Sequence, residues 1–180
     1  MLFRSLAREH VLLAQVAEAI KARPEEVPER IAGIVGKLRD AEKEIAALRA
    51  GQVLAAAAQL AANPLDVHGV AFAAHRAPDG TTADDLRKLA LDVRARLGTR
   101  PAVIASAAVA GGRPVVVVAV NEAGRDLGLK AGALAKTAAG TLGGGGGGKD
   151  DVAQGGGTDA GAVDAALEAV RAQVAATVPA

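Results

Sequence analysis

The sequence predicts a protein of mixed α/β or α+β class, in which an N-terminal helical hairpin or coiled coil precedes a small globular α/β domain. Two patterns predict this division. Apolar residues recur at helical and heptad spacing over residues 1–63, whereas residues 64–180 alternate short β-branched runs with helical patterns. Asn63-Pro64 lies between them, and a residue before proline disfavours helix. We therefore predict a helical subdomain at 1–63 and a globular domain at 64–180.

Composition excludes several classes of function. The formal net charge is +1, so no strong overall field attracts nucleic acid or anionic lipid. The chain has no cysteine, which excludes disulfides and thiol nucleophiles, and aromatic residues make up 1%, which argues against base stacking on aromatic side chains. Its apolar runs are far shorter than the ~20 residues of a membrane-spanning helix. We expect a cytoplasmic protein without membrane contact.

In the helical part, one helix runs from the first residues toward Pro24, and a second begins near Glu25 with Pro28 in its first turn. From Ile31 the second helix follows a heptad pattern, typical of a coiled-coil seam. The predicted seam consists of Ile31, Ile34, Leu38, Ala41, Ile45 and Leu48. The seam implies a partner helix, which is either the first helix folded back as a hairpin or the same helix of a second subunit.

The globular part contains alternating strand and helix patterns. Thr81 or Thr82 is the predicted cap of a helix that Gly98 ends, and Gly111-Gly112-Arg113-Pro114 predicts a hairpin connection. The Val-rich run after that turn is expected to be buried on both faces. The predicted elements are a strand at 67–74 with Phe72 inward, a helix at 82–97, strands at 102–109 and 115–120, a loop at 121–130, and helices at 131–142 and 162–174. They predict a sheet of three strands or slightly more.

Residues 143–157, GGGGGGKDDVAQGGG, form the most unusual stretch. Glycine loses more conformational entropy on folding than other residues and supplies no side chain, so no packed core is expected to need this run. Its predicted use is close approach of the backbone to a ligand. A flexible linker is the alternative, although linkers usually interleave serine or threonine. We predict a functional loop.

The chemistry of this loop favours binding over hydrolysis. Gly143 through Lys149 match the first seven positions of a phosphate-binding loop, but Asp150 stands where the pattern requires a hydroxyl for magnesium. The remaining hypothesis is a nest of backbone amides that receives a phosphate or ribose, assisted by Lys149 and Gln154. A solvated Lys149 paired with Asp150 or Asp151 is the alternative. The candidate RNA-binding residues are Lys136, Gly145, Gly146, Gly147, Gly148, Lys149, Gln154, Gly155, Gly156 and Gly157.

Catalytic and metal-binding constellations are not evident. His68 and His75 are seven residues apart on one predicted strand, hence on opposite faces, and make no metal pair. Neither serine lies in a nucleophile-elbow pattern. Arg87 and Arg94, on one face of a helix that looks salt-bridged, are a weaker hypothesis for RNA contact.

The end of the glycine segment carries a resemblance to a known family. Asp151 to Asp159, DVAQGGGTD, closely resembles the C-terminal end of bacterial alanyl-tRNA synthetases. FRSLAREHVLLAQV at 3–16, PEEVPER at 24–30 and LRDAEKEI at 38–45 look like the helical segments that precede it in that family, so the resemblance covers essentially the whole chain. Lys149-Asp150 replaces the Arg-Pro usual in the family.

The resemblance implies a C-terminal module, C-Ala, that is related to the DHHA1 domain and binds tRNA(Ala) at the outer elbow. Catalysis with ATP, magnesium and zinc would belong to upstream synthetase domains, so this segment is expected to need no cofactor and to perform neither aminoacylation nor editing. The implied mechanism is tethering of tRNA, with a possible homodimer through the coiled coil. The alternative is a dimerisation or domain-packing module with little RNA contact. A phosphoesterase would require metal-dependent turnover, which we do not expect.

Overall fold

The computed structural model describes residues 2–179, without the side chains of residues 2–7, 10, 46, 49, 50 and 54. The chain forms two compact units, Met1–Leu48 and Arg49–Ala180. Helix α2 contributes residues to both units. The division predicted at residue 63 stays a prediction.

The first unit contains α1 (Leu2–Ala19), the short 3₁₀ helix η1 (Pro24–Glu26) and the start of α2 (Val27–Ala62). Ala17 and Val27 are its buried apolar residues among the described side chains. Pro28 lies in the first turn of α2, and α2 ends directly before Asn63-Pro64, as predicted.

The predicted seam on α2 is open to solvent. Ile31 is 42% exposed, Leu38 58% and Leu48 62%, and the other seam residues are exposed as well. α1 leaves these side chains uncovered. The dimer stays a prediction.

The second unit is built on a six-stranded mixed sheet in the order β1-β2-β3-β4-β6-β5. The strands are β1 (Leu65–Val67), β2 (Val70–Arg76), β3 (Ala102–Ala110), β4 (Arg113–Val120), β5 (Gly145–Gly148) and β6 (Val152–Gly156). Only β2 and β3 pair in parallel; the other neighbours are antiparallel. The mixed α/β class is confirmed, and the sheet is larger than expected.

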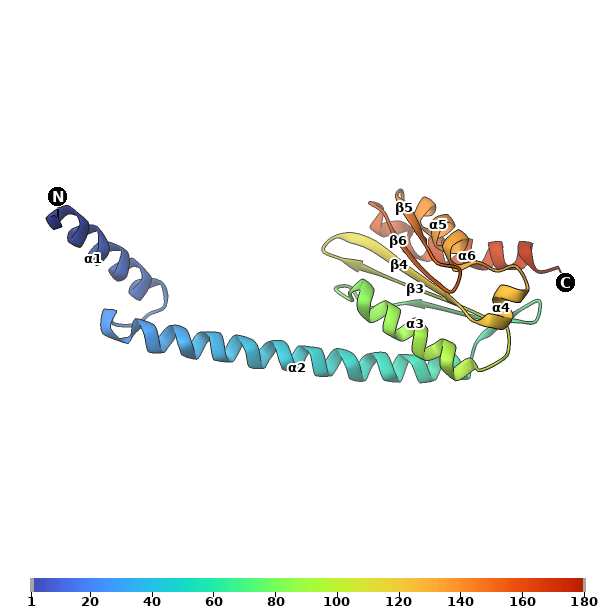
Figure 1. Ribbon diagram of the computed structural model, residues 1–180, viewed down its shortest axis with the longest axis horizontal. Coiled ribbons are helices and arrows are strands. Elements are labelled where there is room, and N and C mark those ends of the chain that lie inside the picture. Colours follow the sequence, from blue (N-terminus) through green and yellow to red (C-terminus); the bar gives the residue numbers. More distant parts are fainter. Residues whose placement is uncertain (1, 180) are drawn as a thin grey trace. The chain divides into compact units, whose positions relative to one another are not determined.

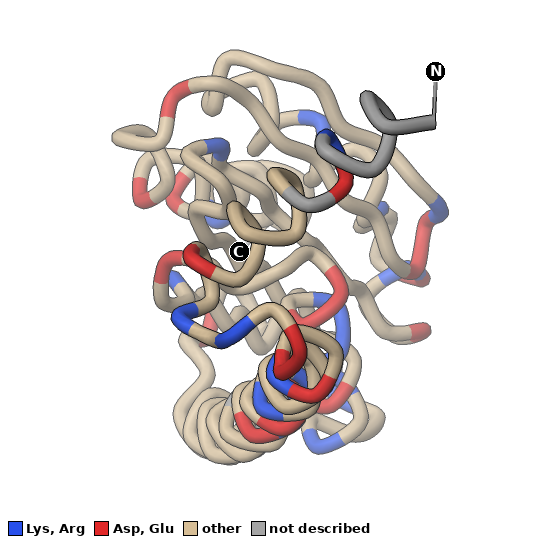
Figure 2. The backbone as a smooth tube through the Cα atoms, turned by 90° about the vertical axis from the view of Figure 1, so that its left-hand side faces the viewer, with Lys and Arg blue, Asp and Glu red and all other residues tan. Residues whose placement is uncertain are grey.

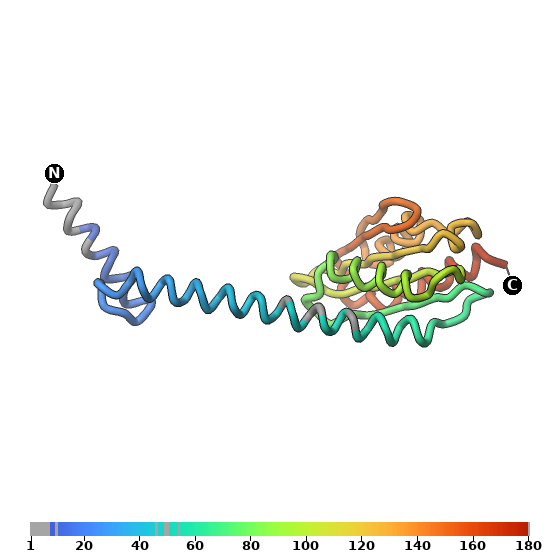
Figure 3. Tube along the Cα trace, turned by 60° about the horizontal axis from the view of Figure 1, so that its bottom comes forward, coloured from blue at the N-terminus to red at the C-terminus, as the bar shows by residue number. Residues whose placement is uncertain are grey.

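Helices cover both faces of the sheet. α5 (Ala131–Thr141) and α6 (Val163–Thr177) bury one face with Val116, Val118 and Val120 of β4. α3 (Ala83–Leu97) and the last turns of α2 lie side by side on the other face, which Figure 3 shows in green and teal. In Figure 1, α3 covers β3 and β4 while β5 and β6 extend beyond it. The sheet is thus fully layered in its middle and partly open at one edge.

The central hairpin matches the sequence prediction. Gly111 and Gly112 have φ of 58° and 77°, and two successive positive φ values are typical of a two-residue hairpin turn. Val116 to Val120 are all buried, because helices cover the strand on both sides. Thr82 caps α3, its hydroxyl oxygen accepting from the Asp85 amide at 3.2 Å, which settles the choice between Thr81 and Thr82.

Two local predictions are wrong. The loop predicted at 121–130 contains the short helix α4 (Glu122–Asp126), whose cap is Asn121, because the Asn121 side chain accepts from the Gly124 amide. His68 lies in a tight turn rather than on a strand with His75: His68 and Gly69 have φ of 49° and 84° and reverse the chain between β1 and β2. In the described part of the chain, no helix is both long and apolar enough for a membrane crossing.

Candidate nucleic-acid interface

The glycine segment is a β-hairpin at the edge of the sheet. β5 is the outermost strand, and its glycines pair with β6, Gly147 opposite Gln154 and Gly145 opposite Gly156. The segment is a hairpin rather than the predicted loop or the alternative linker, whereas its predicted binding role stays a prediction. The predicted nest of amides is wrong, because successive N–H groups of a strand point in alternating directions and cannot converge on one anion.

One face of this hairpin packs against α5. A Cβ added to Gly146 would lie 2.8 Å from the Ala135 carbonyl oxygen, and one added to Gly155 would lie 2.7 Å from the Ala139 Cβ. Both distances are too short for real atoms, so only glycine lets α5 lie this close. The expectation that no packed core needs the glycine run is therefore wrong for this face.

Three further glycines are restricted by backbone atoms. A Cβ on Gly144 would lie 2.1 Å from the Gly156 oxygen, and one on Gly157 would lie 2.0 Å from the Leu142 oxygen. A Cβ on Gly156 would lie 2.8 Å from the oxygen of Pro114 in β4. The close fit of these segments explains most of the second glycine cluster.

The other face of the hairpin is open. A Cβ on Gly145 or Gly147 would meet nothing within 4 Å, and Gln154 beside them is exposed. This face continues the surface that α3 covers farther along the sheet. Between α3 and the hairpin lies a groove of about 320 Å³. The groove is lined by Arg87, Val117, Gly147, Gly148, Lys149, Asp151, Val152, Ala153 and Gln154.

Two cations on the walls of the groove have no carboxylate partner. Among the described residues, neither Arg87 of α3 nor Lys149 of the β5–β6 turn forms an ion pair. The acids next to Lys149 are paired elsewhere. Asp150 lies 3.5 Å from Lys130, and Asp151 lies 3.9 Å from Arg94, which also donates to the Asp151 carbonyl at 3.4 Å. Arg87 and Lys149 are exposed and remain available to an anion.

The other candidates lie differently. Lys136 is exposed on α5, which packs on the opposite face, so the structure does not bring it to the groove. Arg94 is partly buried and held by Asp151. In the sequence, Arg87 is a weak candidate because many other charged residues lie on the same helix. Only the fold shows that Arg87 lies beside the glycine hairpin. Among the described residues, no group of three or more His, Asp or Glu side chains is arranged for a metal ion.

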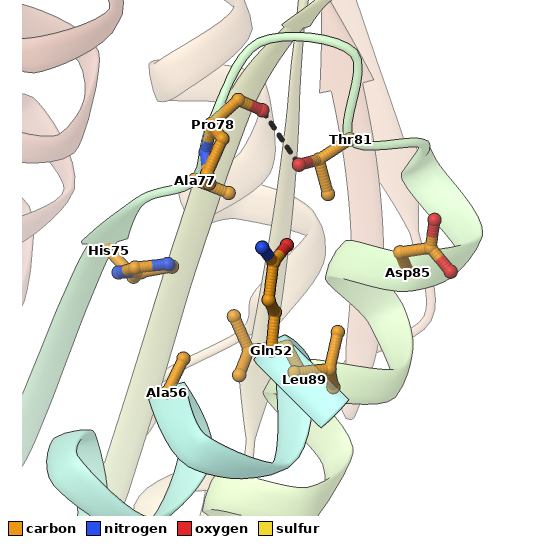
Figure 4. Close-up of a pocket in the computed structure, with 9 residues that line it drawn as sticks. Gln52, Ala56, His75, Ala77, Pro78, Thr81, Asp85 and Leu89 are labelled. Carbon is orange, nitrogen blue, oxygen red and sulfur yellow. Dashed lines mark hydrogen bonds between the residues drawn. The ribbon is translucent and has the colours of Figure 1, made fainter. Parts of the chain in front are cut away.

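A second hollow on the same face of the sheet has a different character. It encloses about 310 Å³ between α2, β2 and α3, and Figure 4 shows Gln52 extending toward the Pro78–Thr81 turn, where the Thr81 hydroxyl donates to the Pro78 carbonyl at 2.6 Å. Its walls are mainly apolar and include the Asp85 carboxylate but no lysine or arginine. Burial lowers the pKa of His75 in its wall, which favours the neutral ring. The groove, not this pocket, is suited to a polyanion.

Known proteins match nearly the whole chain. The chain is 55% identical over 176 residues to the alanine–tRNA ligase of Streptomyces avermitilis and 58% identical over 177 residues to that of Kineococcus radiotolerans. The matches cover 97% and 98% of this chain and 20% of each relative, so the chain spans about a fifth of their length.

The fold comparison agrees with these matches. The C-Ala domain from Aquifex aeolicus alanyl-tRNA synthetase superimposes with a TM-score of 0.54 and 25% identity, covering 63% of this chain and 98% of that one. The DHHA1 domain family matches residues 69–176. The chain therefore belongs to the DHHA1 domain family and corresponds to the C-terminal, C-Ala region of an alanine–tRNA ligase.

Proposed function

We propose that this region binds tRNA(Ala) at its elbow and tethers it for the aminoacylation and editing sites of a cytoplasmic synthetase. The observation that carries the proposal is the groove beside the glycine hairpin, where Arg87 and Lys149 flank exposed backbone and form no ion pair with any side chain that the structure describes. Phosphate oxygens are the usual targets of such side chains in RNA complexes. The similarity to alanine–tRNA ligases supports tRNA(Ala) as the RNA.

The tether acts through effective concentration. Once the elbow of the tRNA is held by a weak contact, its acceptor end meets the other domains of the synthetase within the same complex. This raises the overall affinity without new contacts at the catalytic sites. In this mechanism the region binds and positions RNA and performs no chemistry alone. ATP, magnesium and zinc would be used elsewhere in the synthetase.

The charge distribution favours weak and local binding. The net charge is +1, and Figure 2 shows lysine and arginine interspersed with aspartate and glutamate. If the two unpaired cations neutralise about two phosphates, the slope of log K against log salt is about −2. A binding site made of a broad basic surface would give a much steeper slope.

The direct test is fluorescence anisotropy of labelled tRNA(Ala) with the 180-residue chain at several salt concentrations. Lys149→Glu and Arg87→Glu are expected to weaken binding and to reduce the salt slope by about 1 each. Lys136→Glu is the matched control, because Lys136 is exposed on the opposite side of the sheet. Equal affinity of wild type and both groove variants would remove the groove from the interface.

A second candidate function is homodimerisation or packing against another synthetase domain. The exposed seam on α2 favours it, because Ile31, Leu38 and Ile45 present apolar side chains to solvent at heptad spacing. The two functions are compatible, since the seam and the groove lie in different units of the chain.

A further inference from the structure

We propose that the groove receives the flat face of a nucleobase, stacked on the bare backbone of Gly147, which lines the groove, while Arg87 and Lys149 hold the neighbouring phosphates. Gly145, on the same open face of β5, extends this bare surface beyond the groove. This proposal rests on the proposed function and specifies which part of the RNA occupies the site.

The fold explains glycine on one face of β5 but not on the other. Gly146 contacts α5 so closely that a Cβ would lie 2.8 Å from the Ala135 oxygen, whereas a Cβ on Gly145 or Gly147 has open space around it. Neither Gly145 nor Gly147 has a positive φ, so no backbone strain requires glycine there. Glycine inside a strand is unfavourable compared with other residues. An external group that lies against this backbone accounts for the absence of side chains.

The open face has the shape that a base requires. Gly145 pairs with Gly156, and Gly147 pairs with Gln154, so side by side these four positions present peptide groups and a single amide side chain. RNA-binding proteins commonly stack unpaired bases on aromatic rings. Among the described residues no aromatic side chain lines the groove, and Phe72 is buried. A bare strand surface offers a planar alternative.

The polar groups around this face complement a nucleotide. The exposed Gln154 amide can both donate to and accept from the edge of a base. Arg87 on α3 and Lys149 at the end of β5 stand at the walls of the groove, where they would meet phosphates on either side of the stacked base. Asp151 also lines the groove, but Arg94 lies 3.9 Å from its carboxylate and offsets its charge.

The test uses variants that add atoms only to the open face. Gly147→Ala and Gly147→Val place one and three carbon atoms where the fold leaves room, so the urea midpoint is expected to stay the same or rise. Binding of tRNA(Ala) is expected to weaken about tenfold for Gly147→Val and less for Gly147→Ala. The salt slope is expected to stay at the wild-type value, because the phosphate contacts remain.

Gly140→Ala is the matched control. Gly140 is an exposed helical glycine, also with nothing within 4 Å of a Cβ, and α5 places it away from the groove. Its tRNA affinity is expected to equal that of wild type. Base-specific chemical modification of bound tRNA(Ala) gives a second readout: one or more bases protected by wild type become reactive again with Gly147→Val.

The outcomes separate this inference from the proposed function. If wild type binds tRNA(Ala) and Gly147→Val binds equally well, base stacking is overturned and the tRNA-binding function stands. A weakened Gly147→Val with a shallower salt slope also overturns it, because the lost contact would be a phosphate. If Gly147→Val keeps tRNA binding but loses association with the other synthetase domains, the face packs against protein. No binding by wild type at any salt concentration removes the proposed function itself.

Discussion

Gly146 and Gly155 lie directly opposite each other in the ladder between β5 and β6, and α5 packs against both. A Cβ on either residue would lie 2.9 Å from the Cα of the other, and the Ala139 methyl group would lie within 3.1 Å of both. This pair of glycines is what allows a helix to lie on the hairpin. It also means that substitutions in the glycine segment divide into those that disturb folding and those that disturb only the surface.

Gly155→Ala is expected to destabilise the chain by about 1–3 kcal/mol, because the added methyl group overlaps Ala139 and the backbone of β5. Urea unfolding followed by circular dichroism measures the change. Gly140→Ala, the exposed control on α5, is expected to be neutral or to stabilise by up to about 1 kcal/mol. An undiminished stability of Gly155→Ala would show that α5 can move away from the hairpin at little cost.

Asn121 joins three segments. Its Oδ1 accepts from the amides of Ala102 and Gly124, both at 2.9 Å, and its Nδ2 donates to the carbonyls of Gly98 and Arg100, at 3.1 and 2.6 Å. Asn121→Ala leaves buried polar groups without partners and is expected to cost about 2–4 kcal/mol of unfolding free energy. The matched control is Asn63→Ala at an exposed position, expected to change stability by less than about 0.5 kcal/mol. Equal midpoints for the two variants would contradict this role.

The stability of the chain is expected to fall as pH decreases below about 6.5, partly through His75. Burial lowers the pKa of His75 from its ordinary value of 6.5, so between the two pKa values the unfolded chain binds more protons than the folded one. Stability therefore rises with pH across this window. Urea unfolding of wild type and His75→Gln at pH 5.5 and 7.5 checks this, and the variant should lose less stability on acidification. An identical loss in both proteins would assign the pH dependence to other groups.

The exposed seam predicts self-association. Leu38→Asp places a charge among apolar residues at heptad spacing, so it is expected to convert a dimer of the chain to a monomer in analytical ultracentrifugation. Arg39→Ala, one position around the helix and exposed, is the control that should leave association unchanged. A wild-type chain that sediments as a monomer at every concentration tested would contradict self-association through the seam.

The sequence predicted those elements whose conformation depends on neighbouring residues in the chain, such as helix caps and turns. A cap at Thr81 or Thr82, a hairpin connection within Gly111 to Pro114 and the burial of the Val-rich strand follow from short-range residue preferences, and the structure places them at Thr82, Gly111-Gly112 and Val116 to Val120. β5 could not be predicted in this way, because its four glycines have no strand preference of their own. They form a strand through long-range pairing with β6 and through packing on α5. The helix α4 was missed because five residues are too few for a helical period.

The candidate site was predictable in part. Lys149 and Gln154 were selected from the sequence, and the structure brings both to the groove. The sequence alone could not exclude Lys136 from the site, because only the three-dimensional structure shows that α5 packs on the opposite face of the sheet. Arg87 is far from the glycine segment in sequence, and only the fold places it on the opposite wall. The division of the glycines into packed and open positions likewise depends on which face of β5 the helix covers.

The open space at Gly147 has a practical use. The chain contains no cysteine, so Gly147→Cys would introduce its only thiol, at a position where the fold accommodates a side chain. A photoreactive or fluorescent reagent attached there would report directly on whatever molecule lies against this strand.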